Sequence, residues 1–365
     1  MTFVAVLSGA LTAILIVVLQ RLKFVGTFLD RIDKPHAMHG TPVPRIGGMA
    51  IITATIVVSL LAIDVFARES VVLSIMALAI VLACLSALDD RDGLSVRLRF
   101  GVHAVTAVVL MAVFYANFQT ETNAQNLPLQ FMANVAGLCF LVIVVLWMTN
   151  LYNFMDGANG LAGFMGTIGF AALAVAGHFA PPDVASLNLT TFSAAIAGAC
   201  AVFLVFNFPH ARVFLGDAGS IPLGFLAAAL GMYGALNGNW PWWFPVLVFS
   251  PFIVDASVTL AIRIFRRQRL WQAHRQHYYQ RVILELGWSH TQTTCSYSLL
   301  MILAATHALL MLMSQSPQAL INLNMSALPP FHVGAWVLIY ALLLIGLERR
   351  FSKKKNKSSN KKNEI

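Results

Sequence analysis

The sequence predicts an all-α protein, a polytopic membrane bundle of about 11 transmembrane helices. Hydrophobic residues make up 58% of the 365 residues and charged residues only 11%, whereas soluble domains carry about 25% charge. The apolar segments approach the ~20 residues that a membrane-spanning helix needs. Their centres lack the alternation of polar and apolar residues that a membrane β-barrel strand requires. Composition and segment length therefore favour a helical membrane protein.

Eleven apolar segments account for most of the chain, and we expect each to form one span. Their expected limits are residues 3–20, 46–66, 71–88, 101–118, 132–149, 161–179, 191–208, 221–236, 243–263, 294–313 and 331–347. The segment 221–236 is the shortest and is rich in glycine. We expect one transmembrane catalytic domain over residues 1–348. A basic cytoplasmic tail without fixed structure is expected over residues 349–365.

The placement of lysine and arginine predicts the orientation of the chain. With the N-terminus outside, every Lys and Arg except Arg68 falls in or beside an inside segment, as membrane topology favours. Much of the net charge of +9 lies in the tail, which holds eight Lys or Arg and one Glu. Because the basic charge is mostly this tail, it does not indicate binding of nucleic acid. The tail can contact anionic lipid or fix topology, and we favour the topology signal. The four cysteines show no CxxC spacing, so neither a zinc site nor a disulfide framework is indicated.

The first inside loop combines three prolines with several basic side chains. Lys34, His36, His39 and Arg45 precede the pair Gly47-Gly48. These side chains suit the binding of an anion at the membrane face. The alternative is that their charge only fixes topology, and the sequence leaves both interpretations open.

An acidic pair, Asp89-Asp90, stands at the inner end of the third span. Two carboxylates about 4 Å apart repel each other by roughly 4 kcal/mol at an effective dielectric constant of 20. Anions are also disfavoured at the C-terminus of a helix. The pair therefore needs a cation, a raised pKa or another partner. Arg97 and Arg99 follow closely in the sequence, so electrostatic balance of an ordinary loop is the simpler alternative.

Polar residues also recur at the inner end of the fifth span. Asn150, Asn153 and Asp156 are spaced three apart, so a helical turn would place them on one face. A glycine after Asp156 is explained by a helix end. The polar stripe is not, because polar groups at membrane depth need partners. We therefore interpret these three residues as part of a functional site.

Two further aspartates belong to later spans. Asp217 lies between glycines just before the eighth span, where it suits either an ordinary helix cap or a metal ligand beside a phosphate. Asp255 lies inside the ninth span. An acid at that depth should face the bundle and have a partner there.

The last inside loop contains a cluster of histidine, arginine and tyrosine. Arg275, His277 and Arg281 form its charged core. A zinc site would need a further suitable ligand, so recognition of an anion by arginine fits better. The upstream arginine run is interpreted as a topology signal.

All these polar motifs fall on the inner side of the predicted bundle. Carboxylates, a basic loop and oxygen ligands of the kind that Mg²⁺ prefers indicate chemistry on a phosphate or diphosphate. A secondary transporter of an anionic or nucleotide-linked substrate is the alternative, but its ionisable residues should cluster at the midplane. A polyprenyl-phosphate hydrolase is a third interpretation, for which no nucleophilic Ser or Cys setting is evident.

With these motifs in place, the chain resembles the polyprenyl-phosphate N-acetylhexosamine-1-phosphate transferases, the MraY/WecA-like enzymes of glycosyltransferase family 4. The resemblance runs from about residue 33 to residue 281. It rests on Asp89-Asp90, on the segment from Asn150 to Gly157, on the segment from Gly216 to Ser220 and on the His277 loop. The order and loop placement of the four motifs make the resemblance specific.

The resemblance implies an activity and a location. The family transfers an N-acetylhexosamine 1-phosphate from a UDP-sugar to undecaprenyl phosphate, releases UMP and uses Mg²⁺, for which Mn²⁺ is an alternative. It implies a multi-pass protein of the bacterial inner membrane with a cytoplasmic active site, the N-terminus outside and the C-terminus inside. Undecaprenyl phosphate, a UDP-N-acetylhexosamine and membrane lipid are the expected partners, nucleic acid is not, and a homodimer is left open.

The family motifs carry roles onto particular residues. Asp89 and Asp90 match the catalytic acidic pair. Asp217 and Asp156 are expected to bind the metal. Substrate binding is expected from the remaining polar residues, namely Lys34, Asn150, Asn153, Arg275, His277 and Arg281.

The chain departs from the family pattern at three places. Asn159 replaces the second acid of the DGxDG pattern, Tyr279 and Gln280 replace later histidines of the histidine motif, and Arg91 interrupts the acidic run. These departures argue against both the peptidoglycan enzyme and the standard GlcNAc enzyme. They favour a branch that begins O-antigen or another envelope glycan from a deoxy-N-acetylhexosamine such as FucNAc or QuiNAc.

Overall fold

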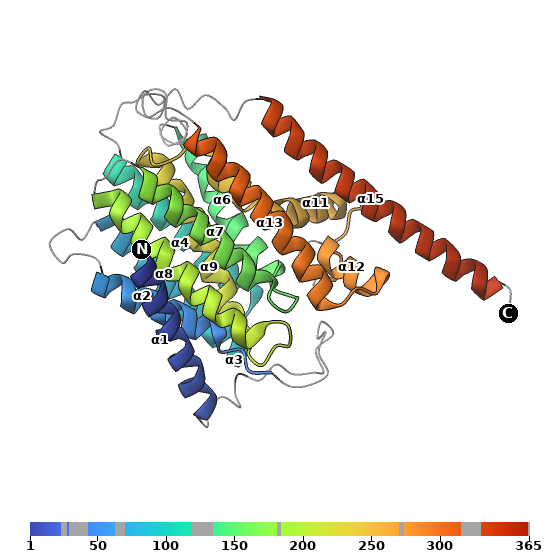
Figure 1. The fold of residues 1–365 in the computed structure, drawn as a ribbon, viewed down its shortest axis with the longest axis horizontal. Helices are drawn as coiled ribbons and strands as arrows, with labels where there is room; N and C mark the ends of the chain where they lie inside the picture. The colour runs from blue at the N-terminus through green and yellow to red at the C-terminus, as the bar shows by residue number, and fades with distance from the viewer. Residues whose placement is uncertain are drawn as a thin grey trace.

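The structure is a computed structural model, and it describes residues 1–22, 28, 43–62, 70–118, 134–180, 184–269, 274–314 and 330–363. The described elements are α-helices, as the composition predicts (Figure 1). Lys34 lies outside the described residues. The bounds of the helices are α1 Thr2–Arg21, α2 Gly47–Ala62, α3 Ser70–Asp92, α4 Val96–Phe118, α6 Val135–Phe154, α7 Leu161–Phe179, α8 Val184–Asn207, α9 Asp217–Leu236, α10 Trp243–Val248, α11 Ser250–Phe265, α12 Tyr278–Leu286, α13 His290–Met313 and α15 Pro330–Asn363.

The helices confirm a polytopic membrane bundle. Among the described segments, nine helices are long and apolar enough to cross a membrane, and α2 is apolar but shorter. The expected span 243–263 is instead two helices, α10 and α11, which meet at Phe249. Pro251 stands at the start of α11, where its missing N–H costs no intrahelical hydrogen bond. The break therefore follows from proline placement inside an apolar segment.

The short, glycine-rich segment forms the most buried helix of the bundle. α9 begins at Asp217, and 94% of its most apolar 18-residue segment is buried. Helices α2, α3 and α6 pack around it. Small residues permit this close packing. A Cβ atom at Gly48 of α2 would lie 2.1 Å from the backbone nitrogen of Gly219, and one at Gly224 would lie 2.4 Å from the carbonyl oxygen of Met148. Glycine at these positions brings the ends of α2, α6 and α9 together.

Gly48→Ala is expected to lower the thermal stability of the purified protein strongly. The new methyl group would meet backbone atoms, and overpacking of this kind typically costs about 1–3 kcal/mol or more. Gly101→Ala in α4 is the matched control, because a Cβ atom added there would have no neighbour within 4 Å among the described residues. Melting temperatures in detergent measure both effects. Equal melting temperatures for the two variants would contradict the close contact between α2 and α9.

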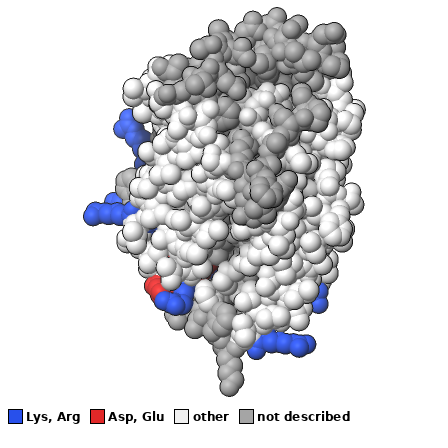
Figure 2. All heavy atoms as spheres, turned by 90° about the vertical axis from the view of Figure 1, so that its left-hand side faces the viewer, with Lys and Arg blue, Asp and Glu red and all other residues white. Residues whose placement is uncertain are grey.

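The surface of the bundle is largely apolar. Figure 2 shows one face on which Lys, Arg, Asp and Glu side chains are confined to the edges and the lower part. Large apolar side chains are exposed on several helices, among them Phe3, Val135 and Phe331. An apolar patch of this extent is typical of a surface that contacts lipid.

The last helix stands apart from the bundle. α15 crosses the right-hand side of Figure 1, and only 11% of its most apolar 18-residue segment is buried. Its C-terminal half packs on α12, where Phe351 and Tyr278 share a small apolar cluster. The tail that was expected from residue 349 onward to lack fixed structure is described as a continuation of α15 to Asn363.

Candidate active site

The acidic pair lies in the last turn of α3, which extends beyond its expected end at residue 88 to Asp92. Asp89 accepts a hydrogen bond of 2.6 Å from the backbone N–H of Leu94 and pairs with Arg99 at 2.8 Å. Asp90 pairs with Arg45 at 3.1 Å, and only 2% of its side chain is exposed. Each carboxylate therefore pairs with its own arginine, which offsets part of the repulsion expected between Asp89 and Asp90.

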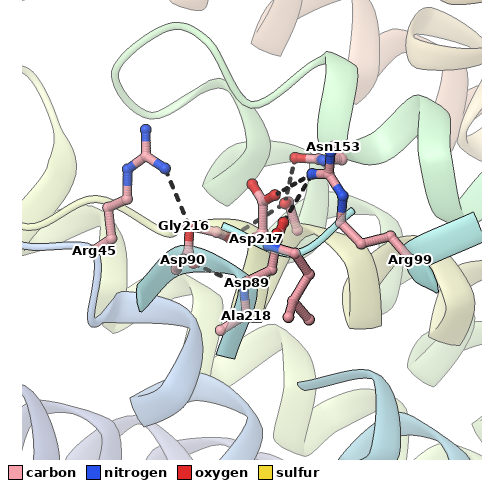
Figure 3. A network of polar contacts seen from close by, with 10 residues as sticks. Arg45, Asp89, Asp90, Arg99, Asn153, Gly216, Asp217 and Ala218 are labelled. Carbon is pink, nitrogen blue, oxygen red and sulfur yellow. Dashed lines mark hydrogen bonds and ion pairs between the residues drawn. The ribbon is translucent and has the colours of Figure 1, made fainter. Parts of the chain in front are cut away.

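The start of α9 completes this part of the site (Figure 3). The backbone N–H of Ala218 points to Asp90 Oδ2 at 3.4 Å. Asp217 lies 4.0 Å from the same Arg99 nitrogen that binds Asp89. Arg99 thus links the two motifs that the sequence places more than a hundred residues apart.

The backbone around Gly216 makes the close approach to Asp90 geometrically feasible. Gly216 has a φ of +72°, and a Cβ atom there would lie 2.9 Å from Asp90 Oδ2. Phe214 donates its N–H to Pro44 O at 2.9 Å, and Gly47 donates to Phe214 O at 2.9 Å. This pairing fixes Arg45 beside Asp90. Only glycine readily combines the left-handed conformation with such a close approach.

The end of α6 supplies the third motif. Asn153 accepts a hydrogen bond of 2.9 Å from the hydroxyl of Ser220 in α9. Helix α6 ends at Phe154, and Asp156 follows in the connecting loop. Burial raises the pKa of Asp156 well above its usual range, with Asp217 adding to the shift and Arg45 opposing it. A shift of this origin means that loss of solvent, more than any single neighbouring charge, disfavours the ionised form of Asp156.

Asn150 makes no described hydrogen bond to Asn153, Asp156 or the start of α9. Its side-chain amide donates to Leu146 O at 2.7 Å, within α6 itself. Its other neighbour is the buried His103 of α4. The expected stripe of three residues is therefore divided, because the helix ends before Asp156 and Asn150 faces α4.

The residues of the last loop separate into two groups. His277 immediately precedes α12, is 4% exposed and stacks against Phe154 at a ring-centroid distance of 5.8 Å. The hydroxyl of Tyr279 donates to Phe154 O at 3.0 Å. These contacts place the start of α12 against the end of α6, next to the Asn153 and Asp156 motif.

Arg281 belongs to the second group and faces away from this position. It pairs with Glu285 at 2.8 Å and with Glu348 of α15, and its guanidinium lies 3.9 Å from the ring centroid of Phe351. In the structure the nitrogens of Arg281 are occupied by Glu348 of α15 and by Glu285 of its own helix, so its role in substrate binding together with Arg275 and His277 stays a prediction. Sequence spacing alone could not reveal which face of α12 meets α15.

The carboxylates do not form a ready-made metal cage. Over the part of the chain that the structure describes, no group of three or more His, Cys, Asp or Glu residues is arranged to hold a metal ion. Mg²⁺ in phosphate-binding enzymes often takes one or two carboxylates and completes its shell with water and substrate phosphate. Asp156 and Asp217 interact electrostatically, and Asp217 is partly exposed. This donor set fits a weakly held Mg²⁺ that needs substrate oxygens.

Several residues that the sequence did not assign to the site prove to belong to it. Arg45 and Arg99 neutralise the acidic pair, and Ser220 holds Asn153. The sequence signal for Arg45 was its position before Gly47-Gly48. For Arg99, the signal was its position closely behind the carboxylates in the sequence, and the structure pairs it with Asp89.

Asn159 serves the loop that carries Asp156. Its side-chain amide donates to Pro209 O at 3.0 Å, and its backbone carbonyl accepts from the Thr294 hydroxyl at 2.7 Å. Its backbone N–H lies 3.4 Å from His290 Nδ1. Asn159 thus ties this loop to the loop before α9 through its side-chain amide and to α13 through its backbone.

The fold and the site together define a class: multi-pass membrane proteins with a charged site at one end of the helix bundle. Residues 72–235 match the model of Glycosyl transferase family 4. This range includes the acidic pair, the Asn153 motif and Asp217.

Similar proteins are found among bacterial membrane transferases. A probable undecaprenyl-phosphate N-acetylglucosaminyl 1-phosphate transferase of Bacillus subtilis is 27% identical over 302 residues, which cover 79% of this chain and 78% of the relative. A phospho-N-acetylmuramoyl-pentapeptide-transferase of the same organism is 29% identical over 307 residues, covering 80% and 90%. A protein with the latter name from Chloroflexus aggregans is 27% identical over 311 residues, covering 78% and 81%. These matches confirm the resemblance that the sequence motifs indicated, to the polyprenyl-phosphate N-acetylhexosamine-1-phosphate transferases.

Proposed function

We propose that the protein transfers an N-acetylhexosamine 1-phosphate from a UDP-sugar to undecaprenyl phosphate and releases UMP. The observation that carries the proposal is the convergence of three motifs, from α3, from the end of α6 and from the start of α9, beside Arg45 and Arg99. Two phosphate anions must approach each other in this reaction, so a site that mixes cations and carboxylates suits it. The name of one relative, the probable undecaprenyl-phosphate N-acetylglucosaminyl 1-phosphate transferase of Bacillus subtilis, supports the lipid acceptor.

Mg²⁺ is the proposed cofactor, with Mn²⁺ as a substitute. Asp217 and Asp156 would hold it, and Asn153, bonded to Ser220 of the helix that begins at Asp217, would orient substrate beside it. A bound metal would shield phosphate charge and polarise the diphosphate. The chain's own part is to keep Asp217 at the start of α9, where Arg99 and the N-terminal end of the helix favour its charge.

Separate roles follow for the remaining residues. Asp89 and Asp90 act on the lipid phosphate, by taking its proton or by placing the metal. Arg275 and His277 bind the diphosphate of the donor. Arg281 pairs with Glu348 of α15 and stays a predicted substrate-binding residue. Lys34 and Asn150 remain predicted substrate-binding residues. In the structure, Asn150 contacts His103 of α4.

The sugar is proposed to be a deoxy-N-acetylhexosamine that begins O-antigen or another envelope glycan. Relatives with two different substrates match this chain about equally well, so similarity alone does not select the sugar. The proposal is supported instead by the departures from the family motif. Tyr279 is fully buried and bonded to Phe154 O, and Gln280 accepts from the His277 backbone N–H at 3.3 Å. Both residues therefore influence sugar choice through the position of α12 and not through direct contact.

The activity assay offers the purified protein a panel of UDP-N-acetylhexosamines with and without undecaprenyl phosphate. We expect UMP release that requires the lipid phosphate and Mg²⁺, and that is fastest with a deoxy sugar. Continuous UMP release that does not require the lipid phosphate would indicate hydrolysis of the nucleotide sugar. No release with any donor, together with uptake of a nucleotide sugar into proteoliposomes, would favour the transporter.

The orientation with the N-terminus outside is also a proposal, based on the distribution of Lys and Arg. In a background without the native cysteines, Ala185→Cys is expected to react with an impermeant thiol reagent in intact cells. Ser358→Cys should react only after permeabilisation. Labelling of Ser358→Cys from outside would contradict the proposed topology. The arrangement as a homodimer stays a prediction.

A further inference from the structure

Asp255 of α11 lies inside an apolar segment, and the structure supplies the partner that its depth requires. Its side chain is nearly buried, with the residue 3% exposed. The backbone N–H groups of Tyr278 and Tyr279 donate to its two oxygens at 2.8 and 3.0 Å. The hydroxyl of Tyr297 in α13 donates to it at 2.5 Å, and that of Thr259 at 3.3 Å. The carboxylate is thus satisfied by residues of three helices.

These contacts make Asp255 the cap of a different helix. The first N–H groups of an α-helix have no partner within the helix, and a carboxylate at this end also favours the helix dipole. Asp255 binds two successive N–H groups at the start of α12. A nine-residue helix is too short to be stable on its own, so its position depends on such anchors.

The cap has a direct consequence for His277, the residue just before α12. Asp255 Oδ1 lies 3.5 Å from His277 Nδ1. The imidazole ring stacks against Phe154 and against Tyr279, at centroid distances of 5.8 and 6.1 Å. A tilt of α12 would therefore move this ring relative to the end of α6.

We propose that Asp255 is a positioning residue: it fixes the N-terminus of α12 and so aims His277 at the diphosphate of the nucleotide sugar. Tyr297 is the residue that holds Asp255 in place. The proposal rests on the proposed function, because it assumes that His277 binds the donor. The role differs from that of the acidic motifs, since Asp255 acts through α12 and contacts no substrate.

Asp255→Asn and Tyr297→Phe test the cap without removing volume from the core. Hydrogen exchange of peptides that cover residues 274–287 reports on the N–H groups that Asp255 binds. We expect faster exchange in this segment for both variants and unchanged exchange at the start of α9. Glu285→Gln is the matched control, because Glu285 is an exposed acid of α12 that contacts only Arg281 among the pairs described. If Asp255→Asn does not fold, Tyr297→Phe removes only one hydroxyl and still decides the question.

The kinetic test separates positioning from a merely structural role. Both variants should raise KM for the UDP-sugar by about tenfold to a hundredfold, as loss of a hydrogen bond to a charged group typically does. KM for undecaprenyl phosphate should stay within about twofold. Combining Asp255→Asn with His277→Ala should add little to the effect of His277→Ala alone, because the two residues act as one unit.

Three results would overturn the proposal. Unchanged exchange with unchanged KM would show that Asp255 does not hold α12. Faster exchange with unchanged KM would show that α12 does not present His277 to the donor. Unchanged exchange with a raised KM would indicate direct contact with substrate. A wild-type protein that releases no UMP would contradict the proposed function instead, and hydrogen exchange would still decide whether Asp255 caps α12.

Discussion

Asp217→Asn is expected to lower kcat by roughly 10²–10⁴-fold while the protein remains folded. Asp217 is the first residue of α9, partly exposed, and near both Arg99 and the loop that carries Asp156. Asparagine keeps the shape but removes the charge that a metal ion requires. Because the start of α9 is capped through Gly216 and Ala218 contacts, the helix itself should not depend on this carboxylate.

The measurement is kcat as a function of Mg²⁺ concentration. Higher Mg²⁺ should restore part of the activity if substrate phosphates provide the remaining ligands. Asp92→Asn serves as the control, since Asp92 is an exposed acid of the same site region that pairs with its neighbour Arg91. Near-normal turnover of Asp217→Asn at low Mg²⁺ would show that Asp217 is not a metal ligand.

The second large effect is expected at the acidic pair. Asp89→Asn and Asp90→Asn should each reduce the rate by about 10²–10⁴-fold, the usual contribution of a positioned general base. The structure adds that both side chains are nearly buried and each has its own arginine. Removing one carboxylate therefore also deprives Arg99 or Arg45 of that ion pair, which should alter the affinity for phosphate groups.

The fate of the donor in the absence of lipid distinguishes two chemical routes. We expect direct attack by the lipid phosphate on the β-phosphorus of the UDP-sugar, because a phosphate oxygen is already a competent nucleophile. The P–O bond to UMP would break as the new P–O bond forms. A covalent aspartyl intermediate would instead release UMP, without lipid, in an amount equal to the enzyme. Such a burst, absent from the Asp variants, would contradict direct attack.

The membrane class and the acidic motifs could be predicted because both are local properties of the sequence. Apolar segments of helical length define the spans. Asp89, Asp90, Asp156 and Asp217 each stand at a span end, so their common side of the membrane follows from counting spans. The structure adds that Arg99 connects Asp89 to Asp217 and that Ser220 of α9 bonds Asn153 of α6.

Contacts between distant helices could not be predicted from one sequence. The partner of Asp255 is the start of α12, which lies 23 residues later in the chain. Arg281 faces α15 because a nine-residue helix has two sides, and only the fold decides which side meets Glu348. The break between α10 and α11 depends on where prolines fall inside an otherwise continuous apolar segment.

The most direct test of the central claim follows a phosphorus label from donor to lipid. The purified protein is incubated with undecaprenyl phosphate, Mg²⁺ and a UDP-N-acetylhexosamine labelled with ³²P at the β-phosphate, and the organic phase is counted. Transfer of a sugar 1-phosphate predicts that the β-label and the sugar enter the lipid fraction in equal amounts, and that Asp90→Asn and Asp217→Asn abolish both. Sugar in the lipid fraction without the β-label, or a label that remains in the aqueous phase while UMP is released, would contradict it.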